Sequence, residues 1–207
     1  NPSKFKMVTR RSLTSAPSSV NFLGYEFFFE TDSKGKTRIQ YGITTEKQDK
    51  YNARIDEIIE DYKRNNDVEL LRHRILAFAS RTVYVSKKYN NNIWKVKGFI
   101  NNYGELRFLI DTRLLHSSTK AFLKDMITNA FSRNAVSLPY FLIGASDQRG
   151  YNLLNNMVAN RTLLFVEHVG YGKTGLEKLC VQIGISVSGK GYGNLVREYL
   201  IKTKVGY

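Results

Sequence analysis

Basic and aromatic side chains are interleaved between residues 70 and 104. This stretch contains no Asp or Glu, whereas the whole chain of 207 residues carries 32 Lys and Arg against 18 Asp and Glu. Lys and Arg pair with phosphates and aromatic rings stack on bases or sugars, which is the combination that single-strand and hybrid-duplex grooves use. The sequence therefore predicts a nucleic-acid interface made of Arg72, Arg74, Arg81, Lys87, Lys88, Trp94, Lys95, Lys97 and Tyr103. For any single residue a solvated basic face stays open, and Trp94 could equally anchor the core.

The overall charge of the chain supports a polyanionic partner. Its formal net charge is +14, and neutralising phosphates is what such a surplus does best. Nucleic acid is the first candidate, and an anionic membrane surface is the second. No apolar stretch approaches the roughly 18 residues that span a bilayer, and no signal-peptide pattern opens the chain. The lone Cys180 suits a reducing compartment, so we expect a soluble, cytoplasmic protein that binds no membrane.

Two glycine-rich segments could be phosphate-binding loops, but their sequences fit ordinary turns better. The sequence GYGKTG at 170–175 matches the end of a Walker A motif. Glu167, however, stands where the first glycine of that motif should be, and its carboxylate would repel phosphates. The second cluster, at 189–193, lacks the βαβ context of a dinucleotide-binding fingerprint. We interpret both as turns before helices, and leave a backbone contact with phosphate open as the minority interpretation of the second.

Residues that could act as nucleophiles or metal ligands come without partners in the sequence. Cys180 belongs to an apolar set that is typical of a core, and Ser117 and Ser118, next to His116, lack a recognisable base and orienting group. The three histidines are far apart and form no metal-ligand pattern. We therefore expect neither nucleophilic catalysis nor metal binding from these residues.

The elements that position the basic and aromatic residues can be predicted from periodicity. Alternating apolar residues over 20–43 predict a hairpin, and Gly24 inside its first strand indicates a bulge or the close approach of another backbone or ligand. Helical spacing predicts a helix over 45–64 with a capping box at Thr45 and Gln48, and a second helix capped by Asp67. We expect a loop over 82–103. Further helices are predicted at 105–116, 119–133, 151–160, 174–183 and 194–202, and the run 163–169 is a strand or a buried helix. The predicted fold class is α+β, mostly α, with an N-terminal β-hairpin before a helical body.

Two short segments resemble motifs of bacterial-type reverse transcriptases, those of group II introns, retrons and phage-defence systems. The segment VNFLGYEF at 20–27 resembles the primer grip, and NPSK at 1–4 resembles the end of the preceding palm motif, with Phe5 where Thr is usual. The resemblance implies that the primer terminus is held by a turn made of Phe22, Leu23, Gly24 and Tyr25. It also makes Lys4 the candidate general acid on the pyrophosphate leaving group.

The same resemblance implies a division of the chain into three regions. These are the end of the palm with the primer-grip hairpin at 1–44, a thumb-like basic helical region at 45–104 and a helical C-terminal extension at 105–207. In this family, paired aspartates bind Mg²⁺ for nucleotidyl transfer, and no aromatic-Ala-Asp-Asp sequence occurs in this chain. We therefore expect the full-length protein to be an RNA-directed DNA polymerase that uses Mg²⁺, and this segment alone to bind no cofactor and to be inactive.

The predicted function is thus that of the C-terminal part of a reverse transcriptase that grips an RNA template and its DNA product, in antiviral defence against phage. Whether the template is a dedicated noncoding RNA and whether the chain oligomerises are left open. The alternative is a stand-alone basic RNA-binding module without polymerase activity, for which the basic run would be the whole function.

Overall fold

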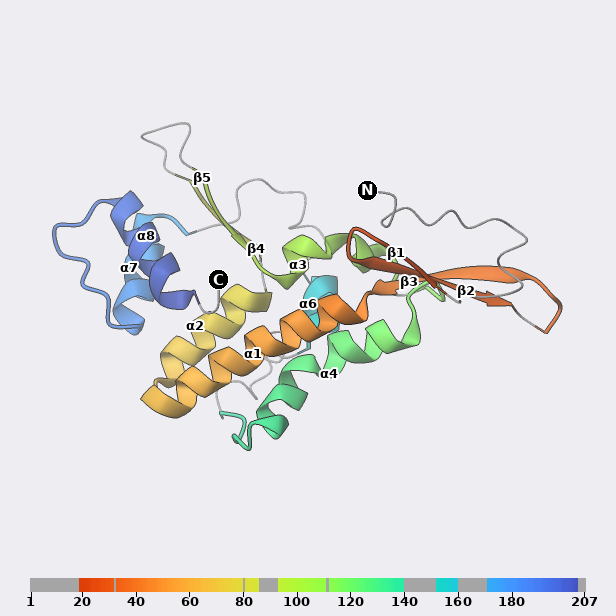
Figure 1. Ribbon diagram of the computed structural model, residues 1–207. Coiled ribbons are helices and arrows are strands. Elements are labelled where there is room, and N and C mark those ends of the chain that lie inside the picture. The colour runs from red at the N-terminus through yellow and green to blue at the C-terminus, as the bar shows by residue number, and fades with distance from the viewer. Residues whose placement is uncertain are drawn as a thin grey trace, which may run out of the picture.

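An antiparallel sheet and a set of helices make up this computed structural model, which describes residues 19–31, 33–79, 81–85, 93–110, 112–139, 152–159 and 171–204. The sheet consists of β1 (Ser19–Phe22), β2 (Tyr25–Thr31) and β3 (Thr37–Ile43), in the order β1-β2-β3. The helices that follow it lie to one end of the sheet (Figure 1). The predicted α+β class with mostly helical content is confirmed.

The N-terminal sheet has one strand more than the predicted hairpin. Residues 20–27 do not form one strand, because β1 ends at Phe22 and a turn at Leu23 and Gly24 reverses the chain into β2. At the other edge of the sheet, Tyr41 of β3 forms a parallel bridge with Leu115. The sheet is therefore connected to the segment that precedes the helix at 117.

Two helices follow the sheet, and both have side-chain caps. Helix α1 (Thr45–Asn65) is capped by Thr44, whose side chain accepts a hydrogen bond from the Lys47 N–H, so the predicted capping box at Thr45 was wrong by one residue. Gln48 Nε2 donates instead to the Ile43 carbonyl at 2.8 Å. Helix α2 (Val68–Ala79) begins as predicted, with the Leu70 N–H donating to Asp67 Oδ1 at 2.9 Å.

Residues 81–116 depart most from the predictions. The expected loop over 82–103 contains a second antiparallel hairpin, β4 (Arg81–Val85) paired with β5 (Ile93–Lys97), followed by the short helix α3 (Phe99–Asn102). The helix predicted over 105–116 is only a 3-10 helix, η3 (Gly104–Phe108), followed by turns and the bridge at Leu115. A bridge to β3 uses the backbone groups that a longer helix would have needed, which explains the early end.

The main core lies between α1, α2 and the later helices α4 (Ser117–Arg133) and α6 (Leu153–Ala159). Its buried apolar residues run from Ile43 to Met157 and form one connected cluster across the predicted thumb-like region and extension. Helices α1 and α4 start together at the end of β3, where Thr119 Oγ1 accepts the Ile43 N–H at 3.0 Å. They then run side by side in the same direction (Figure 1), as the hydrogen bond from Arg133 to Asp56 also shows.

The last two described helices form a smaller cluster of their own. Helix α7 (Lys173–Gln182) and helix α8 (Tyr192–Thr203) pack through Leu176, Cys180 and Leu195, and Leu70 of α2 joins them. Their positions confirm the helices predicted at 174–183 and 194–202. The run 163–169 lies outside the described residues.

Polar contacts of His73 join α2 to both α7 and α8. His73 is 3% exposed. Its Nε2 lies 3.2 Å from Gln182 Oε1, and its Nδ1 lies 2.7 Å from the Tyr199 hydroxyl. Because a carbonyl oxygen can only accept, Nε2 carries the proton and Nδ1 accepts from Tyr199. Burial lowers the pKa of His73 below its ordinary value of 6.5, partly opposed by the bond to Gln182 and by the charge of Glu69.

This buried histidine predicts a stability that depends on pH. A lowered folded-state pKa means that the unfolded chain binds more protons in the range between that pKa and 6.5. The contribution of neutral His73 is thus fully present above pH 6.5 and is lost as the pH falls below it. We expect urea unfolding at constant ionic strength to show this loss of stability. In the His73→Gln variant the free energy of unfolding should change less with pH over this range. An identical pH dependence in the variant would contradict the assignment.

Candidate functional site

The turn between β1 and β2 exposes two large apolar side chains. The register pairs Phe22 with Tyr25, so Leu23 and Gly24 form a two-residue turn in which φ is +50° and +85°. Turns with positive φ at both central residues, type I′, are usually made by Asn-Gly or Gly-Gly. Here Phe22 is 62% and Leu23 82% exposed. A leucine held at positive φ with its side chain in solvent is strained without gaining burial, and such strain is concentrated at functional sites.

Gly24 fixes this turn against the start of α1. Its carbonyl accepts a hydrogen bond of 3.2 Å from the Thr44 N–H, at the N-cap of the helix. A Cβ atom added to Gly24 would lie 3.1 Å from the Tyr103 hydroxyl and 3.3 Å from Lys47 Cε. The prediction for Gly24 assumed a position inside a strand. The residue lies in a turn instead, and the atoms that a Cβ would approach are side chains of the protein itself.

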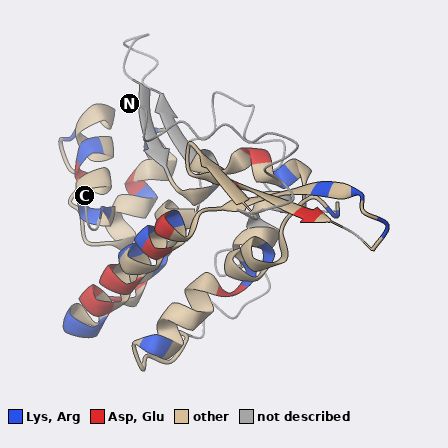
Figure 2. Cartoon of the chain, turned by 45° about the vertical axis from the view of Figure 1, so that its right-hand side comes forward, with Lys and Arg blue, Asp and Glu red and all other residues tan. Residues whose placement is uncertain are grey.

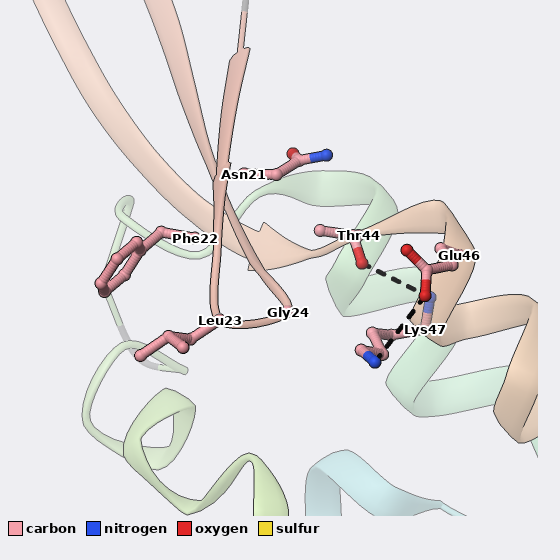
Figure 3. A pocket seen from close by; sticks show the side chains of 7 residues that line it. All are labelled: Asn21, Phe22, Leu23, Gly24, Thr44, Glu46 and Lys47. Atoms are coloured by element: carbon pink, nitrogen blue, oxygen red, sulfur yellow. Dashed lines mark hydrogen bonds and ion pairs between the residues drawn. The ribbon is translucent and has the colours of Figure 1, made fainter. Parts of the chain in front are cut away.

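An open pocket of ≈ 430 Å³ lies between this turn and the start of α1. Figure 3 shows Phe22 and Leu23 on one side of the turn and Thr44, Glu46 and Lys47 on the other. Lys47 Nζ lies 3.8 Å from Glu46 Oε1, so the two charges offset each other. The lining residues, Asn21, Phe22, Leu23, Gly24, Thr44, Glu46 and Lys47, include no Ser, Cys or His. The pocket can therefore hold a ligand through apolar and hydrogen-bonding contacts.

Three tyrosines, Tyr25, Tyr51 and Tyr103, pack against one another beside the turn and support it. Tyr25 meets Tyr103 edge to face at 5.4 Å between ring centroids, and Tyr103 meets Tyr51 at 5.8 Å. The Tyr25 hydroxyl donates to the Asn102 carbonyl at 3.4 Å, and Asn102 Nδ2 donates to the Tyr51 hydroxyl at 2.8 Å. Burial raises the pKa of both Tyr25 and Tyr103, so these phenols stay neutral. Tyr103 is 4% exposed, so its predicted role as a stacking surface was wrong.

The predicted phosphate-binding arginines on α2 make contacts within the fold. Arg74 is ion-paired with Asp61 of α1 and donates from Nε and Nη2 to the Lys202 carbonyl of α8. Its side chain is only 12% exposed, so it is not presented outward. Arg72 is more accessible and lies 3.8 Å from Glu69. Of the two, Arg74 therefore acts chiefly to hold α1, α2 and α8 together.

The other predicted site residues lie on the second hairpin or outside the described part. The register of β4 and β5 places Arg81 opposite Lys97 and Tyr84 opposite Trp94, with Lys95 opposite Val83. The strands thus bring four of the predicted basic and aromatic positions onto one hairpin. The remaining predicted residues, Lys4, Lys87 and Lys88, lie outside the described residues.

Residues discounted from sequence have structural roles here. Gly172 is the N-cap of α7 and Gly191 that of α8, as expected for turns before helices. Cys180 is buried in the smaller cluster. His116 Nδ1 lies 2.7 Å from Ser118 Oγ and accepts the Ser118 N–H at 3.3 Å. This pairing forms the N-cap of α4.

The part of the chain that the structure describes shows neither a metal-binding cluster nor a membrane-spanning helix. Over these ranges no group of three or more His, Cys, Asp or Glu side chains is placed to hold a metal ion. None of the described helices has the length and hydropathy of a membrane span. The strained, exposed turn with its neighbouring pocket is therefore the candidate site that the geometry singles out.

The chain matches no protein-family model, no curated protein and no solved structure. Any functional assignment accordingly depends on the residues themselves and on the contacts described above.

Proposed function

We propose that this chain is the C-terminal part of an RNA-directed DNA polymerase, that it grips the primer and the template duplex, and that the whole enzyme acts in antiviral defence. The supporting observation is the exposed tip of Phe22 and Leu23 on a strained turn fixed by Gly24. This turn lies in the segment that resembles a primer grip. The antiviral role depends on that resemblance alone.

In this proposal the turn orients the primer end. Phe22 and Leu23 pack against the sugar and base of the last nucleotide, while the Gly24 carbonyl bond and the tyrosines beneath keep the tip in place. Correct placement of reacting groups accounts for a large part of enzymatic rate enhancement, and a 1 Å displacement can cost about 100-fold. The described residues offer no carboxylate cluster that fits Mg²⁺, so we assign no metal-dependent step to this chain.

Two substitutions test the turn in the full-length protein. Gly24→Val is expected to abolish primer extension while leaving RNA affinity nearly intact, because a Cβ atom would press on Tyr103 and Lys47 and disfavour the positive φ. Leu23→Asn creates Asn-Gly, the preferred type I′ sequence, so it should keep or strengthen the turn while removing the apolar tip. We expect Leu23→Asn to reduce primer extension about 100-fold at unchanged thermal stability.

The matched control is Ile201→Asn, since Ile201 is a 63% exposed apolar residue on α8. It should leave both extension and affinity unchanged. Normal extension by a folded Leu23→Asn protein would refute the proposal. Equal loss of extension and RNA affinity in Gly24→Val, with folding preserved, would favour the stand-alone RNA-binding module.

A further inference from the structure

Three exposed cations on α4 and the segment before it have no acidic partner among the described residues. Arg113, Lys120 and Lys124 are all exposed, and in the described part of the chain none of them takes part in an ion pair. Helix α4 carries a single acidic residue, Asp125, and has none in its first turn. This surface, which we call the α4 face, consists of Arg113, Ser117, Lys120, Ala121 and Lys124.

Helix α1 differs in carrying charges of both signs. Its six acidic residues outnumber its five basic ones, and the exposed positions include Glu46, Asp49, Glu57 and Glu60. Several of its cations are already paired, such as Lys63 with Glu60 at 2.8 Å and Arg64 with Asp61 at 3.2 Å. Figure 2 shows acidic and basic residues together along α1. A polyanion thus meets charges of both signs on the outer side of α1, whereas the α4 face offers it cations alone.

The α4 face is held rigidly beside the sheet. The Tyr41 N–H donates to the Leu114 carbonyl at 2.7 Å, and the His116 N–H donates to the Tyr41 carbonyl at 2.9 Å. The His116 ring stacks on Phe28 with centroids 3.7 Å apart. Lys120 and Lys124 are four residues apart and so lie on one side of the helix, about 6 Å apart along its axis. Ser117 and Ala121 lie on the same side of the helix, and their small side chains let a backbone approach closely.

We propose that the α4 face binds the sugar-phosphate backbone of a nucleic acid. The choice of partner rests on the proposed function. A membrane surface fits less well, because no large apolar side chain of α4 is exposed, and interfacial helices insert such side chains into the lipid. In this proposal the α4 face makes some of the phosphate contacts that the sequence predicted for Arg74.

The test compares two double variants of equal charge in the 207-residue chain. Lys120→Gln with Lys124→Gln removes both lysines of the α4 face and keeps Arg113. Lys50→Gln with Lys178→Gln removes two exposed lysines on α1 and α7 instead. Binding to a labelled RNA–DNA hybrid is measured by fluorescence anisotropy over a range of salt concentrations. Circular dichroism and thermal melting confirm that both variants fold as the parent does.

We expect the α4 variant to lose at least tenfold in affinity and its log–log salt slope to fall by about two, since each phosphate contact contributes about 0.9. The control should change affinity less than twofold. If the α4 variant binds as the parent does, the inference fails while the proposed function stands. If the parent chain binds no hybrid even at low salt, both fail, and binding to phosphatidylserine vesicles instead would identify a membrane surface.

Discussion

Replacing Gly42 by alanine is expected to lower the free energy of unfolding by about 3 kcal/mol. A Cβ atom at this position of β3 would overlap Thr119 Oγ1 and would lie 2.8 Å from Phe28 Cε2. Thr119 is fully buried, and its Oγ1 accepts the Ile43 N–H. The added methyl group must therefore displace the start of α4 from the sheet or break this hydrogen bond. Chemical denaturation of the folded chain measures the loss.

A second glycine provides a control for which we expect the opposite change in the free energy of unfolding. Gly193 lies in α8, and a Cβ atom there would meet nothing within 4 Å. Gly193→Ala should therefore stabilise the chain by up to about 1 kcal/mol through helix propensity. In the Gly42→Ala background, Thr119→Ala removes the clashing oxygen, so the double variant should lose less stability than the sum of the two single losses. Additive losses would show that the Thr119 contact is not the cause.

Replacing Arg74 by methionine is expected to cost about 3 kcal/mol, because it breaks a largely buried ion pair and leaves the Asp61 carboxylate with Arg64 and Asn65 as its remaining partners. Arg74 also provides the donors for the Lys202 carbonyl, which methionine cannot replace. Burial alone would raise the pKa of Asp61, but the hydrogen bonds from Arg74 and Arg64 outweigh it and hold that pKa below its ordinary value. The substitution should thus raise the pKa of Asp61, which NMR titration can follow alongside urea unfolding.

Arg64 supplies the matched comparison, since it contacts the same carboxylate at 3.2 Å from a side chain that is 72% exposed. Arg64→Met should change stability by no more than about 0.5 kcal/mol, as is usual for exposed ion pairs. Comparable losses from the two variants would mean that burial of Arg74 adds nothing. A loss from Arg74→Met with an unchanged pKa of Asp61 would argue against the ion pair and for packing alone.

Helical periodicity gave reliable predictions where one face of a helix is apolar. The helices α1, α2, α4, α7 and α8 were all expected near their observed positions, because each presents a continuous stripe to a core. The β4–β5 hairpin was missed because Asn-rich and basic residues between the strands favoured a loop. The β-branched residues Val83, Val85, Ile93 and Val96 were the available signal for it.

The candidate site could be predicted only in part. The resemblance to a primer grip predicted a turn at residues 22–25, and the structure contains a turn there. That Leu23 has positive φ could not be foreseen, because Leu-Gly is not a typical type I′ sequence. The ion pair of Arg74 with Asp61 and its hydrogen bond to the Lys202 carbonyl could not be foreseen either, because tertiary packing brings these partners to it. The α4 face was missed because its cations are scattered among Ser, Ala and apolar residues.

The parallel course of α1 and α4 has an electrostatic consequence. Each helix dipole is equivalent to about half a positive charge at its N-terminus, and both N-termini lie together at the end of β3. Aligned dipoles repel each other, a cost that is offset by packing along the helices and by the pair of Arg133 with Asp56 near the C-terminus of α4. The two positive ends add to the charges of Arg113 and Lys120. At the sheet end of the helices these positive contributions oppose the charge of Glu46 in the first turn of α1, so the field there is less negative than the net charge of α1 alone would produce.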